Sequence, residues 1–282
     1  MKKIYGVFLV FIMISFLTTS CSDSGTNPES KRMRTYARLS NRFDSDYNQI
    51  YSSGHISVKY YPAVSQTDFL LDGLNIYEDD NYVLTGSYWE YSESGEDWDD
   101  PMYHWLANRT YELEITANNN DYVSISNCEL PDTFVINENS LPDEINPWDD
   151  FVLNWSNCEN ETNFRLFYRI YGDDWDTLID SLTILDSDTN TFTFTSAMLN
   201  IPGAYYISIY LTAINGPAIT PDSEGNFSGD GDGYFYGEYD PGSLEINYEN
   251  SRNGASNKLN RINRGKELKE KAEDLFKNYL GF

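Results

Sequence analysis

The chain is poor in the residue types that most catalytic and zinc sites use. Its 282 residues include two histidines, His55 and His104, and three cysteines. Neither histidine begins a metal-ligand spacing such as HExxH, and the sequence contains no GxSxG, no P-loop and no GxGxxG after an expected strand. These absences argue against a zinc site and against nucleophile–histidine catalysis. A hydrolase with two paired carboxylates is left as a remote alternative, because aspartate and glutamate number 45.

Basic residues are scarce and unevenly placed. Lysine and arginine number 19 against 45 acidic residues, which gives a net charge of −26. Such a chain is repelled by phosphate backbones, so we expect no nucleic-acid partner. The last segment, residues 251–282, differs because it holds eight basic and four acidic residues; its charge is therefore +4, and that of the remaining 250 residues is −30.

No apolar run is long enough for a membrane-spanning helix. The longest, Ile4 to Leu17, has 14 residues, whereas a span needs about 20. It follows Lys2 and Lys3 and precedes Thr18, Thr19, Ser20 and Cys21, an order typical of a signal peptide.

The end of this signal resembles the lipobox of bacterial lipoproteins, in which the cysteine is acylated. The resemblance implies removal of residues 1–20, a lipid on Cys21 and a polar tether over 21–35. The protein is then expected in the cell envelope, anchored to a bacterial membrane, with the outer membrane favoured and either periplasmic or surface exposure. Ordinary secretion with cleavage nearby is the alternative.

The C-terminal segment has the pattern of an amphipathic helix. Its apolar residues recur at helical spacing, with charged residues on the opposite face: Leu268, Ala272, Leu275, Phe276, Tyr279 and Leu280. A helix of about 16 residues is marginal alone in water. We therefore expect it to dock on another apolar surface.

Between these ends the chain reads as short alternating strands separated by turn residues, which is typical of β-sandwiches. In "NFRLFYRIYG", Phe164, Leu166, Tyr168 and Ile170 are expected to point inward and Arg165, Phe167 and Arg169 outward. Tyr205, Ile207, Ile209, Leu211 and Ala213 form a second inward face, and Tyr111, Leu113, Ile115 and Ala117 a third. Asp72–Gly73 predicts a tight hairpin turn.

The later half resembles a fibronectin type III domain. The residues that carry this likeness are Trp155, the turn Pro202–Gly203 before Tyr205, and the strand that closes in "TAINGP". The predicted fold class is all-β, with two tandem immunoglobulin/fibronectin type III-like sandwiches, at 36–129 and 130–250, and a short C-terminal amphipathic helix. Such sandwiches host many roles, so we expect a non-catalytic binding or assembly module.

Two loops combine tryptophan with acidic residues. "NPWDDF" contributes Trp148, Asp149 and Asp150, and "GDDWDT" contributes Asp173, Asp174, Trp175 and Asp176. The strand order expected for the later half places both loops at the pole away from the first sandwich. They are either polar turns or a rim that binds a sugar, calcium or a cationic partner. A carbohydrate-binding surface lipoprotein is thus the alternative function.

No cofactor is expected, with calcium as the one alternative. Asp230 and Asp232 look calcium-like, but the EF-hand spacing would require glutamate where Gly237 or Tyr239 lies. The partner, protein or glycan, is not identified by the sequence.

A disulfide between Cys128 and Cys158 is predicted from the expected pairing of the first two strands of the later sandwich. If Thr133 faces Leu153, the same register places the two cysteines opposite each other. An oxidising compartment permits the bond, which would close a loop of about 30 residues and contribute roughly 3 to 4 kcal/mol. Two unrelated buried thiols are the alternative.

The last expectation concerns where the tail docks. The final strand of the later sandwich should end beside Trp148 and Trp175, so the basic tail emerges next to five carboxylates. We expect the helix to fold back over this rim, or otherwise to stay free and recruit a partner.

Overall fold

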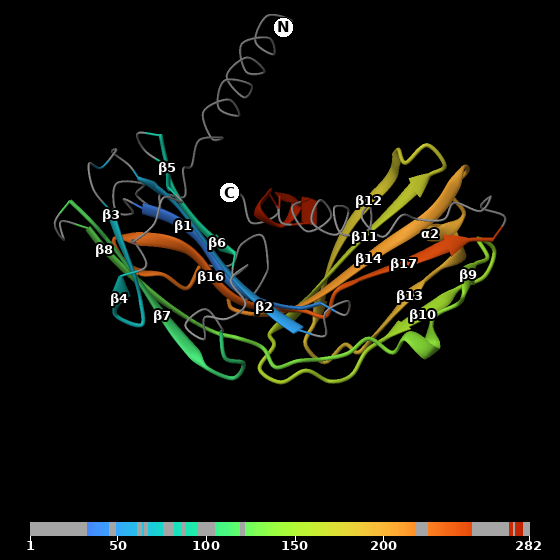
Figure 1. Ribbon diagram of the computed structural model, residues 1–282, viewed down its shortest axis with the longest axis horizontal. Coiled ribbons are helices and arrows are strands. Elements are labelled where there is room, and N and C mark those ends of the chain that lie inside the picture. Colours follow the sequence, from blue (N-terminus) through green and yellow to red (C-terminus); the bar gives the residue numbers. More distant parts are fainter. Residues whose placement is uncertain are drawn as a thin grey trace, which may run out of the picture.

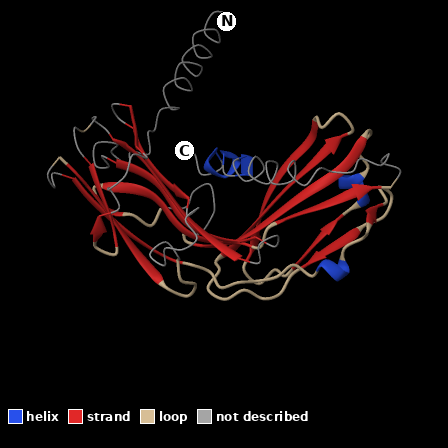
Figure 2. Cartoon of the chain, viewed as in Figure 1, coloured by secondary structure: helices blue, strands red, loops and turns tan. Residues whose placement is uncertain are grey.

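The computed structural model describes residues 33–44, 49–60, 64, 67–75, 82–85, 88–94, 105–118, 122–217, 225–249, 271–272 and 274–278. The signal segment, Cys21 and most of the tether lie outside these residues, as does the "EDWDDP" stretch at 96–101. Strands dominate the described part (Figure 2). None of its helices is long and apolar enough to cross a membrane.

The strands fall into an earlier and a later group. The earlier group comprises β1 (Met33–Asp44), β2 (Gln49–Tyr60), β3 (Thr67–Leu71), β4 (Leu74–Asn75), β5 (Tyr82–Thr85), β6 (Tyr88–Ser94), β7 (Thr110–Ala117) and β8 (Tyr122–Glu129). The later group comprises β9 (Glu144–Ile145), β10 (Phe151–Asn154), β11 (Asn163–Gly172), β12 (Thr177–Asp186), β13 (Thr191–Phe194), β14 (Ala204–Asn215), β15 (Ser228–Gly229), β16 (Gly231–Asp240) and β17 (Ser243–Tyr248). Two short helices, η2 (Glu138–Ser140) and α2 (Ser196–Leu199), lie in connections, and residues 271–272 and 274–278 are helical.

One large sheet runs through both halves of the molecule. Its ten strands follow the order β12-β11-β14-β16-β1-β2-β6-β5, with β17 paired to β14 and to β9. A five-stranded sheet, β15-β8-β7-β3-β4, lies against the earlier half, and the two-stranded sheet β10-β13 lies against the later half. Figure 1 shows the large sheet continuing from β5 and β6 at the left to β11 and β12 at the right.

Each half has its own hydrophobic core. The earlier core lies between the large and the five-stranded sheets and includes Ala37, Ile56, Phe69 and Leu113. The later core contains the predicted inward residues Phe164, Leu166, Tyr168, Ile170, Ile207, Ile209, Leu211 and Ala213. The predicted alternation is therefore confirmed for these residues. It is wrong for Tyr205, which was expected to point inward but lies outside this core, because the register of β14 against β11 shifts between Tyr171 and Gly172.

The hairpin predicted at Asp72–Gly73 is also confirmed. The two residues join β3 to β4, and Leu71 pairs with Leu74. Both have positive φ, 51° and 76°, as a two-residue turn with the twist of a hairpin requires.

Strand β16 belongs to both halves, although it comes between β14 and β17 of the later half in the sequence. Residues Met33 to Arg42 of β1 pair in parallel with Gly231 to Asp240 of β16. Phe235 of β16 packs in the earlier core and Tyr239 in the later core. The segment between β14 and β17 is therefore an insertion that completes the earlier sandwich rather than a long loop of the later one.

Gly237 allows this insertion to pass close to the chain leaving β8. A Cβ at this position would lie 2.1 Å from the carbonyl oxygen of Glu129 and 2.9 Å from Cα of Leu130. Any side chain would push against backbone, which cannot move aside as a flexible side chain can.

The predicted disulfide is wrong, because Cys128 and Cys158 are both free and buried. Cys128 lies in the earlier core and Cys158 in the later one. The register is also different: Trp155 bridges Ile136, whereas the predicted pairing would set Pro131 opposite it. The Cys158 thiol instead donates to the carbonyl of Asp132 at 3.1 Å. Burial raises the pKa of Cys128 well above its ordinary value and that of Cys158 to about 12, so both thiols stay protonated.

Candidate binding surfaces

The first acidic tryptophan loop, between β9 and β10, is exposed. Trp148 has 72% of its surface exposed, and Asp149 and Asp150 are exposed as well. The Asp150 carboxylate accepts the backbone N–H of Ser196, the first residue of α2, at 2.5 Å. Asp150 therefore has a local structural role, since it satisfies a free N–H at a helix start.

The second loop, between β11 and β12, presents its tryptophan from a strained backbone. Trp175 has φ of +65°, which is a genuine outlier for a bulky side chain. The backbone N–H of Trp175 donates to the backbone carbonyl of Gly172 at 3.2 Å, and the backbone N–H of Gly172 donates to the backbone carbonyl of Asp176 at 2.9 Å. The indole is 44% exposed, and its ring centroid lies 5.0 Å from that of Tyr206 and 6.1 Å from that of Tyr205.

The two tryptophans have different supports. Trp148 stands on the connection from the large sheet to the two-stranded sheet, whereas Trp175 stands on a connection within the large sheet and packs on β14. Asp173, Asp174 and Asp176 surround Trp175 in sequence and are exposed. A single rim that joins both loops stays a prediction.

A second surface is formed by the face of the large sheet that points away from both cores. Basic residues of two strands lie on it, among them Arg38 and Arg42 from β1 and Arg165 and Arg169 from β11. Tyr36, Ile214, Tyr234 and Tyr236 pack together on the same face and are buried. We call this surface the saddle, because it lies where the two halves of the sheet meet (Figure 1).

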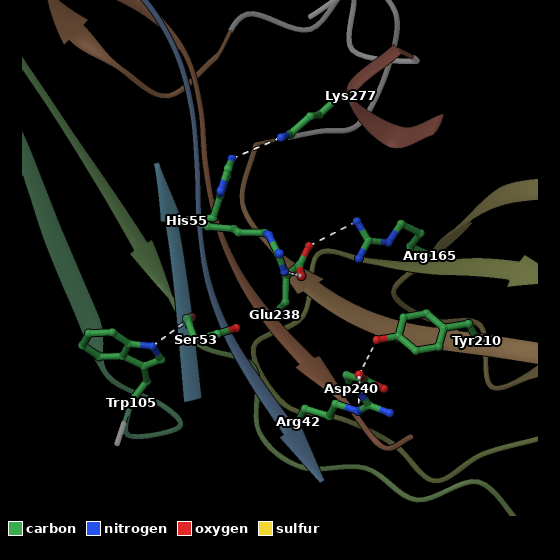
Figure 3. Close-up of polar contacts among 10 residues, drawn as sticks. Arg42, Ser53, His55, Trp105, Arg165, Tyr210, Glu238, Asp240 and Lys277 are labelled. Atoms are coloured by element: carbon green, nitrogen blue, oxygen red, sulfur yellow. Dashed lines mark hydrogen bonds and ion pairs between the residues drawn. The ribbon is translucent and has the colours of Figure 1, made fainter. Parts of the chain in front are cut away.

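Buried carboxylates on β16 tie the saddle together. Glu238 lies 3.2 Å from a guanidinium nitrogen of Arg165 and 3.4 Å from one of Arg38. The side chains of Glu238 and Arg165 are each only 1% exposed. Figure 3 shows how Glu238 lies between strands of the two halves, so this ion pair joins them.

Asp240 makes the second link. Its carboxylate accepts a hydrogen bond from the hydroxyl of Tyr210 and lies 3.4 Å from Nε of Arg42 (Figure 3). Burial, and then the charge of Asp240, raise the pKa of Tyr210 well above its ordinary value. The phenol therefore stays protonated and donates to Asp240.

The C-terminal helix packs onto this saddle. Phe276 is fully buried with Tyr36, Ile214, Tyr234 and Tyr236, and Ala272, one turn earlier, is fully buried against Phe167 and Tyr210. The Arg165 guanidinium carbon lies 4.9 Å from the centre of the Phe276 ring. Within the described residues the helix thus lies at the junction of the two halves, rather than over Trp148 and Trp175 as expected from the sequence.

Lys277, the residue after Phe276, also contacts the saddle. Nζ of Lys277 lies 3.1 Å from Nε2 of His55 and 4.9 Å from the centre of the Tyr36 ring (Figure 3). This spacing suits an ammonium that donates to a neutral imidazole and sits over an aromatic face.

Sequence reasoning did not single out Glu238, Asp240, Tyr210, Tyr36 or His55. The one available signal was the outward face of β11, where Phe167 stands between two arginines. A large aromatic residue on the outer face of a sandwich strand indicates that something covers it.

The described residues hold no group of three or more histidine, cysteine, aspartate or glutamate side chains that could bind a metal ion. Asp230, one of the calcium-like residues, accepts the backbone N–H of Val123 at 3.1 Å. It therefore links β8 to the insertion before β16.

No protein-family model and no curated protein matches the chain. Solved structures with some likeness include the FN1–FN3 domains of chicken CNTN1, with 8% identity, 76% of this chain and 63% of that structure covered, and a TM-score of 0.24. The fibronectin(III)-like modules of CbhA from Clostridium thermocellum share 10% identity over 79% of this chain and 98% of theirs, with a TM-score of 0.24. The central fibronectin-III array of RIM-binding protein shares 14% identity over 69% of this chain and 58% of its own, with a TM-score of 0.19. These scores are too low to support conclusions about function.

Proposed function

We propose that this protein is a non-catalytic binding or assembly module of the bacterial cell envelope, held to a membrane by a lipid on Cys21. The lipobox-like end of the signal segment supports the anchor, and the outer membrane is the proposed site, with the body in the periplasm or at the surface. The proposed partner is a protein or a glycan.

The observation that carries the binding role is the setting of Trp175. Holding a non-glycine residue in the left-handed region costs roughly 1 to 2 kcal/mol. Trp175 adopts this unfavourable conformation while it is 44% exposed, and its ring packs against those of Tyr205 and Tyr206. Strained backbone that presents an exposed aromatic side chain is typical of ligand-binding loops.

The charged groups of the saddle favour a structural rather than a catalytic reading. Glu238 and Asp240 are buried and face arginines, and His55 contacts Lys277 of the tail. Each of these groups already serves to hold strands or the helix together, which supports the proposal of a non-catalytic protein.

The anchor is tested by replacing Cys21. We expect Cys21→Ala to remove the acylation site and to release the protein from the membrane fraction into the soluble fraction of disrupted cells. Metabolic labelling with a fatty acid should mark the wild-type chain and leave the variant unlabelled. Equal membrane retention of the two chains would contradict the proposed lipid anchor.

Carbohydrate binding is the second candidate, and the exposed, supported indole of Trp175 favours it because aromatic faces stack on sugar rings. Titration with envelope oligosaccharides should change the tryptophan fluorescence of the wild-type chain and leave that of Trp175→Ala unchanged. Trp148→Ala is the matched control, since this second exposed indole lies on a different connection. A response that persists in Trp175→Ala would assign the binding to another part of the protein.

A further inference from the structure

The saddle recognises the tail through a small number of side chains. Within the described helix, Phe276 and Ala272 are fully buried, while Leu275 and Lys277 are half-buried and Lys271, Asp274 and Asn278 are exposed. The determinants are therefore a small residue, an aromatic residue four positions later and a basic residue next to it. This i, i+4 pattern is how amphipathic helices commonly dock into grooves.

Within residues 271–272 and 274–278 the contact consists of few side chains, chiefly Ala272, Phe276 and Lys277. A short helix has little stability of its own in water, so docking depends on side-chain burial of this kind. The sequence has 21 residues, 250–270, between Glu249 and Lys271, and a chain of this length spans up to about 70 Å when fully extended. Neither Ala272 nor Phe276 belongs to the earlier or the later core. Undocking therefore does not require the two cores to unfold.

An undocked helix would leave an aromatic face on the sheet. Tyr36, Ile214 and Tyr236 are fully buried in the cluster that contains Phe276, and Phe167 and Tyr210 are buried in the cluster that contains Ala272. A contiguous exposed surface of this kind is typical of a protein–protein interface. The saddle is thus a preformed site for a helix, whichever chain supplies that helix.

We propose that the saddle accepts the C-terminal helix of a second copy of this chain in place of its own, so that copies assemble by exchanging tails. The same Ala272, Phe276 and Lys277 contacts form in either arrangement. The tail carries +4 and the rest of the chain −30, so opposite charges favour contact between a tail and a body in either arrangement. Two whole copies, at −26 each, repel unless salt screens them or a shared membrane holds them close. The inference rests on the proposed assembly function, because lipid-anchored copies share one membrane plane and reach high local concentrations.

The test uses a labelled peptide of residues 266–282 and full-length chains that carry Cys21→Ala for solubility. In Phe276→Asp the tail cannot dock while the saddle is unchanged, and Ala272→Glu does the same through the other contact. We expect the peptide to bind both variants about tenfold or more tightly than it binds the chain with an intact tail, where the chain's own helix competes. Asp274→Ala, an exposed position on the same helix, should bind the peptide as weakly as the intact chain.

A second arm needs no substitution in the tail or the saddle. Two differently tagged chains are mixed at rising concentration, and one tag is captured. We expect co-capture that grows with concentration and is blocked by the peptide, but not by the same peptide carrying Phe276→Asp.

Two results would overturn the proposal: equal peptide binding by the intact chain and the folded variants, or the absence of peptide-sensitive co-capture. The first result would mean that the peptide does not bind the saddle, and the second that the helix stays on its own chain. Neither result would affect the Cys21 anchor or the Trp175 loop, which the fractionation and the oligosaccharide titration test separately.

Discussion

Replacing Glu238 with glutamine is expected to lower the free energy of unfolding by about 3 to 5 kcal/mol. The glutamate lies 3.2 Å from Arg165 and 3.4 Å from Arg38. Removing its charge leaves the Arg165 guanidinium, with a side chain only 1% exposed, without the carboxylate that compensates its desolvation. The loss should therefore reflect an uncompensated buried charge rather than the intrinsic worth of one ion pair.

Urea unfolding measures this loss, and Arg109→Gln provides the matched control. Arg109 lies 2.6 Å from Asp72, but its side chain is 51% exposed and that of Asp72 is 26% exposed. Breaking an ion pair of this exposure should cost only about 0 to 1 kcal/mol. If the two substitutions cost the same, Glu238 is hydrated in solution and does not hold the halves together.

Phe235→Ala is expected to lower the free energy of unfolding by about 3 to 5 kcal/mol, as deletion of a fully buried aromatic side chain usually does. Phe235 is 0% exposed and packs in the earlier core, beside Phe227 and Ala37. Because β16 pairs with β1 and also with β14, the loss should be transmitted to the later sandwich. Both halves should then unfold in one transition that moves to lower urea concentration.

Fluorescence of chains that keep Trp105 or Trp155 as the single tryptophan follows the two halves separately, because Trp105 packs against the earlier core and Trp155 lies in the later one. Val135→Ala, at a residue 66% exposed, should change stability by no more than about 0.5 kcal/mol. Two well-separated transitions in Phe235→Ala would show that the shared sheet does not couple the cores.

Much of the later core could be predicted from sequence because its signal is local. The alternation of β11 and β14 identifies inward residues within a window of about ten positions, and the Asp72–Gly73 turn is a two-residue signal. The pairing of β1 with β16 has no such signal, since Arg38 and Glu238 are 200 residues apart. For the same reason the sequence gives no sign of the insertion, since nothing near Phe235 indicates that its partners lie at the start of the chain.

The disulfide prediction failed for a related reason. The pairing of the two strands was extrapolated along the chain, but strand register depends on side-chain packing and connection geometry. Cys128 lies inside β8 of the earlier sandwich, paired with Tyr111, and so does not take part in the strand pairing that the prediction assumes. A register extended from the assumed pair Thr133 and Leu153 therefore did not bring Cys128 near Cys158.

The sequence indicates one of the two candidate surfaces, the tryptophan loops, but not the saddle, and the reason is physical. Tryptophan among acidic residues is a compositional signal, and it led to Trp148 and Trp175, which are indeed exposed. The saddle depends on which outward side chains of four strands and a distant helix come together, and outward residues such as Arg165 and Phe167 look like ordinary surface until the sheet is assembled.

The late position of β16 governs the order in which the protein can be completed during synthesis. Strand β1 begins at Met33, yet its parallel partner ends at Asp240, so a nascent chain that stops short of β16 has an open sheet edge at β1 and lacks Phe235 in its earlier core. Open edges pair readily with other chains. The sheet of the earlier half is therefore completed only after β16 has been made. If the chain crosses a membrane from its N-terminus, the first sandwich cannot close until residue Asp240 has also crossed.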